Sequence, residues 1–221
     1  MTDLDSTKRK ILLAAGPIFA VKGFRSATVR EICDSAGVNL ASINYYFGDK
    51  KQLYIDTVIF ARQSRVEQVP DPERIPGTPA EDQLRAYISM LLNRMLALKS
   101  APWQVRLLMR EVMEPTEACR KMVQDFFRPF LEGLMTIVDE IVERELTAQK
   151  RMQLAFSIVG QCMYYRFAGS ITAWVLEDEG IETGFEIEEL VEHVTQFSMH
   201  SLLGMRKESR SDVLVESRKQ K

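Results

Sequence analysis

The chain has 221 residues, of which 46% are hydrophobic and 27% charged, and its mean hydropathy is −0.14. This profile predicts a soluble globular protein with one or two cores and excludes a disordered or fibrous chain. Basic and acidic side chains nearly cancel overall, but residues 1–69 carry a net charge of +3 and residues 70–221 a net charge of −5. A positive surplus confined to the first third favours a nucleic-acid contact there.

Cysteine usage and the amino terminus bear on the compartment. Cys33, Cys119 and Cys162 lie far apart, so they predict neither a disulfide framework nor a zinc site. The first residues do not resemble a signal peptide, and charged residues interrupt every apolar stretch before 18 residues. We therefore expect a cytoplasmic protein with no membrane partner, no metal and no cofactor.

The first expected helix begins near Ser6. Apolar residues at positions 11, 12, 15, 18 and 19 form one stripe at helical spacing, and Gly23 ends the pattern. Pro17 removes one backbone hydrogen bond inside this helix, so we expect a local kink there.

Residues 28–53 predict a helix-turn-helix followed by another helix. Thr28 and Glu31 form a T-x-x-E capping box, Gly37 ends that helix, and Asn39 caps the next one over residues 40–46. Asp49 caps a further helix. Two short helices joined by so tight a glycine turn are typical of a DNA-binding motif.

The remaining sequence predicts a second, helical domain. Four prolines between residues 70 and 79 mark a linker. Beyond it, helical patterns cover residues 80–99, 102–113, 117–146, 149–177 and 186–206, with almost no strand-like alternation. The expected fold is all-α, with a DNA-binding domain at 1–69, the linker at 70–79, a helical effector-binding and dimerisation domain at 80–206, and a disordered tail at 207–221.

The motif is more specific than a helix-turn-helix alone. Residues 23–53 read GFRSATVREICDSAGVNLASINYYFGDKKQL, and this run resembles the TetR family of bacterial transcriptional regulators across about residues 8–60. Two positions depart from the commonest family pattern: Cys33 replaces an alanine and Asn44 a tyrosine. The stretches REVMEPTEA (110–118) and GQCMYYRFA (160–168) resemble the branch with a CecR-type carboxyl-terminal domain.

The resemblance implies which residues meet double-stranded operator DNA. Ile43 and Phe47 face the domain core, which leaves the other side of the recognition helix for the major groove. Phosphate contacts come from the starts of neighbouring helices, and Arg30 often reaches a base edge. Asn44 can read adenine through N6 and N7. The expected DNA-binding residues are Thr28, Arg30, Asn39, Leu40, Ala41, Ser42, Asn44, Tyr45, Tyr46 and Lys50.

For the second domain the resemblance implies effector binding and homodimerisation through the last two long helices. All ten internal methionines lie beyond the linker, and thioether side chains suit either an adaptable apolar cavity or an ordinary core. Arg166 follows an apolar stripe and could meet a ligand carboxylate or a glutamate. Two roles are open for Arg110, Glu111 and Glu114: they could form a charged helix face, or they could anchor the polar part of a ligand in a pocket. The expected effector-binding residues are Met109, Arg110, Met113, Phe126, Phe127, Phe130, Met163 and Arg166.

Competing functions find less support in the sequence. No nucleophile elbow, P-loop, dinucleotide fingerprint or H-E-x-x-H motif is present, so we do not expect an enzyme. His193 and His200 lie on one helix face without a third ligand, which favours interface or core residues. A thiol redox sensor of the same fold is the alternative, although no basic cluster marks a reactive cysteine. We expect a ligand-responsive regulator, a repressor released by a hydrophobic or aromatic molecule through a population shift.

Overall fold

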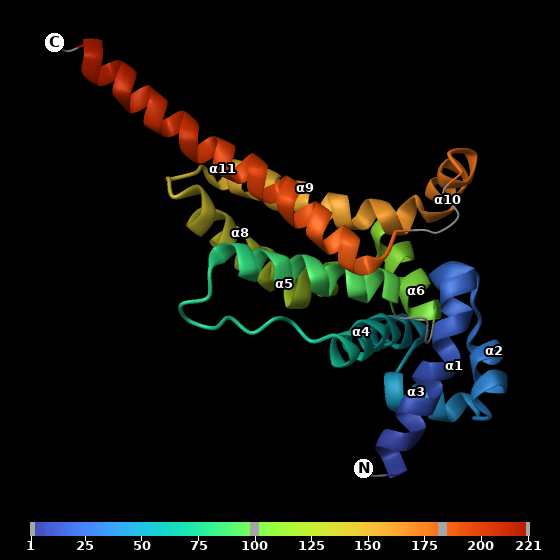
Figure 1. Cartoon of the computed structure of the whole chain (residues 1–221). Helices are drawn as coiled ribbons and strands as arrows, with labels where there is room; N and C mark the ends of the chain where they lie inside the picture. Colours follow the sequence, from blue (N-terminus) through green and yellow to red (C-terminus); the bar gives the residue numbers. More distant parts are fainter. Residues whose placement is uncertain (1–2, 98–101, 181–184, 220–221) are drawn as a thin grey trace. The chain divides into compact units, whose positions relative to one another are not determined.

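The computed structural model describes residues 3–97, 102–180 and 185–219, with side chains described for 6–96, 102–169, 171–180 and 185–206. Within these ranges the regular secondary structure consists of α-helices and two short π-helical segments, with no β-strand, which confirms the all-α prediction (Figure 1). The helices form two compact units. The first combines residues 1–70 with 98–127, and the second combines residues 71–97 with 128–221.

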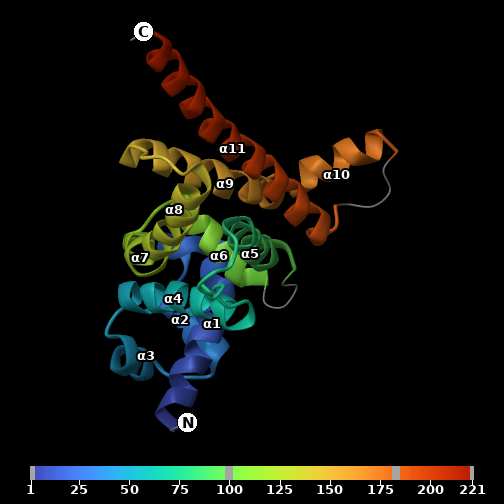
Figure 2. The same cartoon turned by 60° about the vertical axis from the view of Figure 1, so that its left-hand side comes forward.

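The first unit is built around a long amino-terminal helix, α1 (Asp3–Ser26). It also contains α2 (Val29–Ala36), α3 (Leu40–Phe47), α4 (Lys50–Gln68), α6 (Pro102–Met113), α7 (Glu117–Met122) and the π-helical segment η2 (Val123–Phe127). Helix α1 packs against α2, α4 and α6, and Figure 2 shows α1, α2 and α4 gathered together. Ile11, Ala15 and Phe19 of α1 are fully buried in the same core as Leu107 and Ala118, so α6 and α7 complete the core of the first unit.

Helix α1 is interrupted at Gly23 rather than at Pro17. Gly23 has φ 71°, a left-handed conformation that glycine adopts without a steric penalty, and the chain returns to helix as far as Ser26. A Cβ atom on Gly23 would lie 2.5 Å from Nε of Arg110, so this glycine also allows the close approach of α6. A second close approach occurs at Gly16, where a Cβ atom would lie 2.3 Å from the Trp103 ring.

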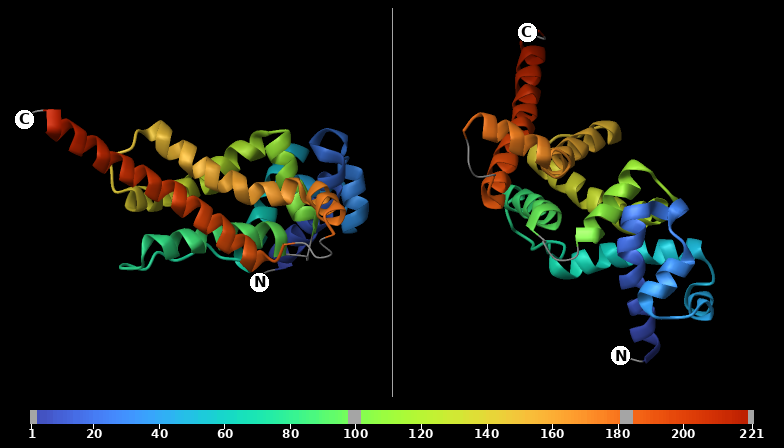
Figure 3. Two further views of the ribbon diagram at one scale, coloured as in Figure 1. Left: turned by 45° about the horizontal axis from the view of Figure 1, so that its top comes forward. Right: turned by 90° about the vertical axis from the view of Figure 1, so that its right-hand side faces the viewer.

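The second unit contains the remaining helices. They are α5 (Ala80–Leu92) with the π-helical segment η1 (Asn93–Ala97), α8 (Arg128–Val142), α9 (Ala148–Phe167), α10 (Gly169–Asp178) and α11 (Ile187–Lys219). Helices α5, α8, α9 and α11 share one core, in which Leu84, Leu134 and Val194 are fully buried. Figure 3 shows α9 and α11 running alongside one another.

The segment 70–79 contains neither helix nor strand. Ion pairs attach it to the second unit, one from Asp71 Oδ1 to Arg94 Nη1 at 2.8 Å and another between Arg74 and Glu140. A separate carboxylate, Asp139, holds the start of α9 through Arg151. The linker is therefore held by charge as well as by its prolines.

Several expected helices differ in their bounds. The pattern over 117–146 is divided into α7, η2 and α8, because Pro129 lacks the amide that an α-helix needs there and a π-helical turn precedes it. The pattern over 149–177 breaks at Ala168, and the helix expected over 80–99 becomes α5 and η1, with residues 98 and 99 outside the described ranges.

The carboxyl-terminal helix also differs from the expectation. Helix α11 continues from Ile187 to Lys219, through the stretch expected to be disordered, because neither glycine nor proline follows Gly204 to end it. Residues 220 and 221 lie outside the described ranges. None of the described helices has the combination of length and apolar character needed to cross a bilayer.

Candidate DNA-binding surface

Helices α2 and α3 form the expected helix-turn-helix, with both caps in place. The Glu31 amide donates to Thr28 Oγ1 at 3.2 Å, and Glu31 Oε2 accepts from the Thr28 amide at 3.1 Å. Gly37 closes α2 in the left-handed conformation with φ 59°, and the Ser42 amide donates to Asn39 Oδ1 at 2.9 Å. The predicted capping box, glycine turn and asparagine cap are confirmed.

Helix α3 has one buried and one open face. Ile43 and Phe47 are 1% and 4% exposed and hold the helix against the core of the first unit, as predicted. On the opposite side Leu40 is 57% exposed and Tyr45 is 74% exposed, which is a large apolar area for a surface helix. Ala41 and Asn44 lie on this open face too. Because Ala41 and Asn44 between Leu40 and Tyr45 are short, the helix could approach the major groove of DNA closely.

Two of the expected contact residues, Thr28 and Ser42, use their hydroxyl groups within the helix caps. Thr28 Oγ1 donates to Glu31 Oε2 at 3.0 Å, and Ser42 Oγ donates to Asn39 Oδ1 at 3.1 Å. Their hydroxyl protons therefore serve the helix caps. A contact from Thr28 or Ser42 to a phosphate would require the hydroxyl to change its acceptor, whereas Asn39 keeps its amide NH2 group for a ligand.

Lys50 and Tyr46 stand beside the open face. Lys50 Nζ donates to the carbonyl of Arg25 at 3.2 Å and lies 5.0 Å from the centre of the Phe24 ring. The Tyr46 ring is half-buried and meets the Tyr45 ring edge-on at 5.0 Å. Arg30 is exposed near the start of α2. The ammonium group of Lys50 and the ring of Tyr46, both fixed by neighbouring residues at the edge of the recognition helix, are suited to phosphate contacts.

Two lysines near this surface were missed by sequence reasoning. Lys8 Nζ lies 5.5 Å from the centre of the Phe47 ring and 3.3 Å from Asp56 Oδ2, while Lys10 Nζ lies 3.6 Å from the position of a Cβ atom on Gly37. The first turns of α1 thus bring cations to the end of α3 and to the turn before it. The basic triplet at residues 8–10, directly before Ile11, was the available signal.

The expected effector-binding residues are divided between the two units. Met109, Arg110, Met113, Phe126 and Phe127 belong to the first unit, and Phe130, Met163 and Arg166 belong to the second. Met113, Phe127 and Arg166 are exposed, whereas Phe130 and Met163 pack against the core of the second unit.

The charged residues of the REVMEPTEA stretch have structural partners within the first unit. Glu111 is fully buried and accepts a hydrogen bond from the Tyr54 hydroxyl. Its other oxygen accepts from the amide of Thr116 at 3.2 Å and from Thr116 Oγ1 at 2.8 Å. Arg110 pairs with Glu114 at 3.0 Å. Glu111 therefore joins α4, α6 and the turn before α7.

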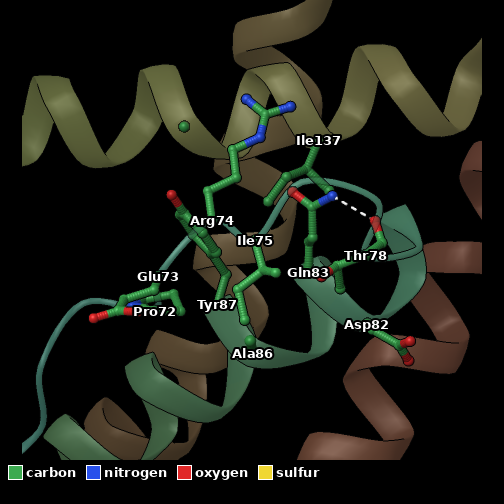
Figure 4. Close-up of a pocket in the computed structure, with 11 residues that line it drawn as sticks. Pro72, Glu73, Arg74, Ile75, Thr78, Asp82, Gln83, Ala86, Tyr87 and Ile137 are labelled. Carbon is green, nitrogen blue, oxygen red and sulfur yellow. Dashed lines mark hydrogen bonds between the residues drawn. The ribbon is translucent and has the colours of Figure 1, made fainter.

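A pocket of about 180 Å³ lies in the second unit, between the linker segment, α5 and α8 (Figure 4). Its walls include Ile75, Tyr87 and Ile137, and Gln83 Nε2 donates to the Thr78 carbonyl at 2.9 Å. Gly133 admits the Tyr87 hydroxyl, which would lie 2.2 Å from a Cβ atom there. None of the expected effector-binding residues lines this pocket.

The cysteines do not have the surroundings of reactive thiolates. Cys33 and Cys162 are buried and Cys119 is half-buried. Burial raises the pKa of all three thiols, that of Cys162 to about 12. Among the described residues no group of three or more histidine, cysteine, aspartate or glutamate side chains could hold a metal ion.

Comparison with known proteins agrees with this geometry. Residues 11–57 match the family described as bacterial regulatory proteins, tetR family, and residues 80–202 match the carboxyl-terminal domain of the HTH-type transcriptional dual regulator CecR. The CecR protein of Shigella flexneri is 25% identical over 188 residues, which cover 79% of this chain and 84% of CecR.

Solved structures show the same fold. A TetR-like transcriptional regulator from Rhodococcus sp. RHA1 aligns with a TM-score of 0.65 at 18% identity, covering 90% of this chain and 96% of the other. HlyIIR, a hemolysin II transcriptional regulator, aligns with a TM-score of 0.58 at 18% identity, covering 87% and 99%. The chain belongs to the TetR family, in the branch with a CecR-type carboxyl-terminal domain, and is a DNA-binding transcriptional regulator rather than an enzyme.

Proposed function

We propose that this regulator binds a near-palindromic operator as a homodimer, represses transcription there, and is released by a hydrophobic or aromatic small molecule. The observation that carries the DNA-binding part is the open face of α3, where exposed Leu40 and Tyr45 flank short side chains above a buried Ile43 and Phe47. Lys50, held against the Arg25 carbonyl, supplies a phosphate contact beside that face. Arg30 and Asn44 read base edges in this proposal.

Exposed stripes on α9 and α11 support the homodimer. On α9, Phe156 and Tyr164 are 49% and 58% exposed and are separated by Gly160, which faces open space. On α11, Phe197 is 60% exposed and its ring lies 6.3 Å from that of His193. Aromatic residues with small neighbours on two long helices suit a four-helix interface between two copies.

The second unit supplies the adaptable core that an apolar effector would need. Phe130 and Met163 pack at its edge together with four further methionines, Met135, Met152, Met199 and Met205. Thioether side chains can rearrange around ligands of different shape. We propose that the effector contacts Phe130 and Met163 there, and that it favours a dimer arrangement unable to span the operator.

CecR of Shigella flexneri is described as a dual regulator. Whether such a protein represses or activates would depend on where its operator lies relative to the promoter. Repression and activation could therefore share one mechanism of DNA binding. The raised thiol pKa values give no support to redox sensing.

The experiment that tests this proposal combines genome-wide footprinting with ligand screening. Footprinting should yield a two-fold symmetric site, and neighbouring genes should indicate the effector class. A thermal-shift screen of apolar and amphipathic compounds should then give hits that reduce operator affinity by about 5- to 150-fold, the range of ordinary coupling energies. Hits confined to sugars or phosphates, or hits without any effect on operator affinity, would contradict the effector assignment.

A further inference from the structure

Helix α10 carries an apolar face that its own chain leaves open. Ile171, Trp174 and Val175 are 59%, 66% and 56% exposed, and their spacing of three and four residues places them on one side of the helix. A tryptophan with two β-branched neighbours is a costly surface to leave in water. This group is called the α10 stripe below.

The core of the second unit does not account for this helix. None of the side chains described for α10, at 169 and 171–178, belongs to the buried cluster that α5, α8, α9 and α11 share. Figures 1 and 3 show α10 at the carboxyl-terminal end of α9, projecting past the packed helices of its unit. The α10 stripe therefore does not contribute to the core of its own unit.

The α10 stripe continues the surface proposed for the dimer. At the end of α9, Tyr164 and Phe167 are 58% and 47% exposed, directly before α10 begins at Gly169. Exposed aromatic residues at the end of α9 are therefore followed within a few positions by the α10 stripe. A partner that covers α9 meets the base of α10 first.

Charge also favours a second copy of this chain over other partners. Glu177, Asp178 and Glu179 follow the α10 stripe, so this end of the helix disfavours an anionic membrane surface. Arg166 on α9 is exposed, and none of the described carboxylates forms an ion pair with it. In a two-fold dimer each copy offers both the acidic end and the arginine.

We propose that α10 is an arm that packs its stripe on the second copy in the dimer, with the acidic end directed to Arg166 of that copy. This inference rests on the proposed homodimer and extends it, because the arm adds contacts beyond α9 and α11. Trp174 is buried in the dimer and open in the monomer.

Trp174 itself provides the test, because the chain has two tryptophans and the other, Trp103, packs inside the first unit. The full chain is diluted from micromolar to nanomolar concentration while sedimentation reports its mass and fluorescence reports the environment of Trp174. A Trp103→Phe variant isolates the signal. We expect blue-shifted emission that is protected from acrylamide in the dimer, and red-shifted, quenchable emission over the same concentrations at which monomers appear.

A second variant keeps the test independent of fluorescence. Val175→Glu should raise the dimer dissociation constant by about tenfold or more, because the new carboxylate must lose water on burial. The matched control is Ile75→Glu in the linker segment, a 62% exposed isoleucine outside the stripe, which should leave the constant unchanged.

The outcomes separate the arm from the dimer. A dimer in which Trp174 stays quenchable would overturn the arm and leave the proposed function intact. A chain that stays monomeric at micromolar concentration would overturn both. Trp174 protection that persists in monomers would show that the chain covers its own stripe, and protection that appears only with added lipid vesicles would assign the stripe to a membrane surface; either result would refute the arm.

Discussion

At the scale of single residues, the cations around α3 come from other helices. Lys50 begins α4, while Lys8 and Lys10 lie in the first turns of α1. The recognition helix itself, α3, contains no lysine or arginine. The cations that could meet phosphate therefore lie outside α3, so substitutions can separate phosphate affinity from the base recognition proposed for Asn44 of α3.

Lys50→Ala is expected to weaken binding to operator and random DNA alike, because the contact proposed for its ammonium group is with phosphate and not with a base. The dependence of log affinity on log salt concentration should flatten by about one unit. Titrations at several salt concentrations measure both quantities. Lys121→Ala on α7 is the control and should change neither; an unaltered salt slope for Lys50→Ala would show that the docking is misassigned.

Lys10→Ala tests the cations that sequence reasoning missed. If the first turns of α1 lie against DNA, this change should reduce the salt slope in the same way and leave the ratio of operator to random affinity unchanged. The effect should add to that of Lys50→Ala, since the two ammonium groups have no shared partner. If the double variant had the same salt slope as Lys50→Ala alone, Lys10 would not belong to the DNA-binding surface.

The buried hydrogen bond between Tyr54 and Glu111 governs stability rather than recognition. Burial and the neighbouring Glu111 raise the pKa of Tyr54, so its hydroxyl remains a donor at any physiological pH. Tyr54→Phe should lower the free energy of unfolding by about 1–3 kcal/mol, because the buried carboxylate loses a donor.

Urea unfolding measures this loss, and Tyr45→Phe on the open face of α3 is the control, with a change within about 0.5 kcal/mol. Combining Tyr54→Phe with Glu111→Gln should cost less than the sum of the two single changes. Strict additivity would mean that the two side chains do not interact in solution.

Residue-level prediction from sequence succeeded where partners are close along the chain. The caps at Thr28 and Asn39 join residues three apart, so the sequence alone contains the whole interaction. The sequence left Glu111 ambiguous because its partner Tyr54 is 57 positions away. The contact residues for DNA and effector stay predictions, since each depends on a partner outside the chain.

At the scale of secondary-structure elements, the cap of α2 makes that helix sensitive to acid. A hydrogen bond from Lys22 and others from Thr28 hold the pKa of Glu31 below its ordinary value of 4.5. A lowered folded-state pKa stabilises the protein above the unfolded value, and this contribution disappears as pH falls through the folded value. The window therefore lies below pH 4.5 and outside the neutral range.

Glu31→Gln should lower the melting temperature at pH 7 and have a much smaller effect at a pH below the folded-state pKa, where wild-type Glu31 is protonated. Melting curves for both proteins across this range give the measurement. Asp34→Asn, on the same helix, is the control and should show no such convergence. Parallel curves for wild type and Glu31→Gln would mean that the carboxylate does not cap α2 in solution.

Helix existence followed from periodicity, but helix ends did not. The apolar spacing continues from α7 through η2 into α8, so it gave no sign of the π-helical turn before Pro129. Helix α9 breaks at Ala168, directly before Gly169, but a single glycine inside an apolar helical pattern is tolerated and does not by itself predict a break. The expectation of a disordered tail after residue 206 rests on its charge and its lack of apolar periodicity, although charged residues other than aspartate form helices readily.

At the scale of the whole molecule, contiguous domains were expected but the compact units are discontinuous. Trp103 packs where Gly16 lacks a side chain, and Arg110 lies on Gly23, so α6 joins the unit that contains α1. Both glycines are visible in the sequence. Their partners are not, because they lie more than 80 positions further along the chain.

Phe197→Glu on α11 is expected to produce monomers at micromolar concentration, because a carboxylate replaces a 60% exposed aromatic residue at the proposed interface. Sedimentation and operator titration should show loss of mass and of operator affinity together. Leu202, on the same helix, is 2% exposed and lies in the core of its own unit, so Leu202→Glu should unfold the chain instead. A stable Phe197→Glu dimer would exclude this face.

The discontinuous first unit has a consequence for synthesis on the ribosome. The core around α1 and α4 stays incomplete until α6 and α7 supply Leu107 and Ala118. A nascent chain that has emerged only as far as the linker carries all the residues expected to meet DNA but lacks part of their support. Order of emergence thus delays a stable DNA-binding unit until residues near 127 leave the exit tunnel, and a fragment ending at residue 69 should be a poor substitute for the full chain.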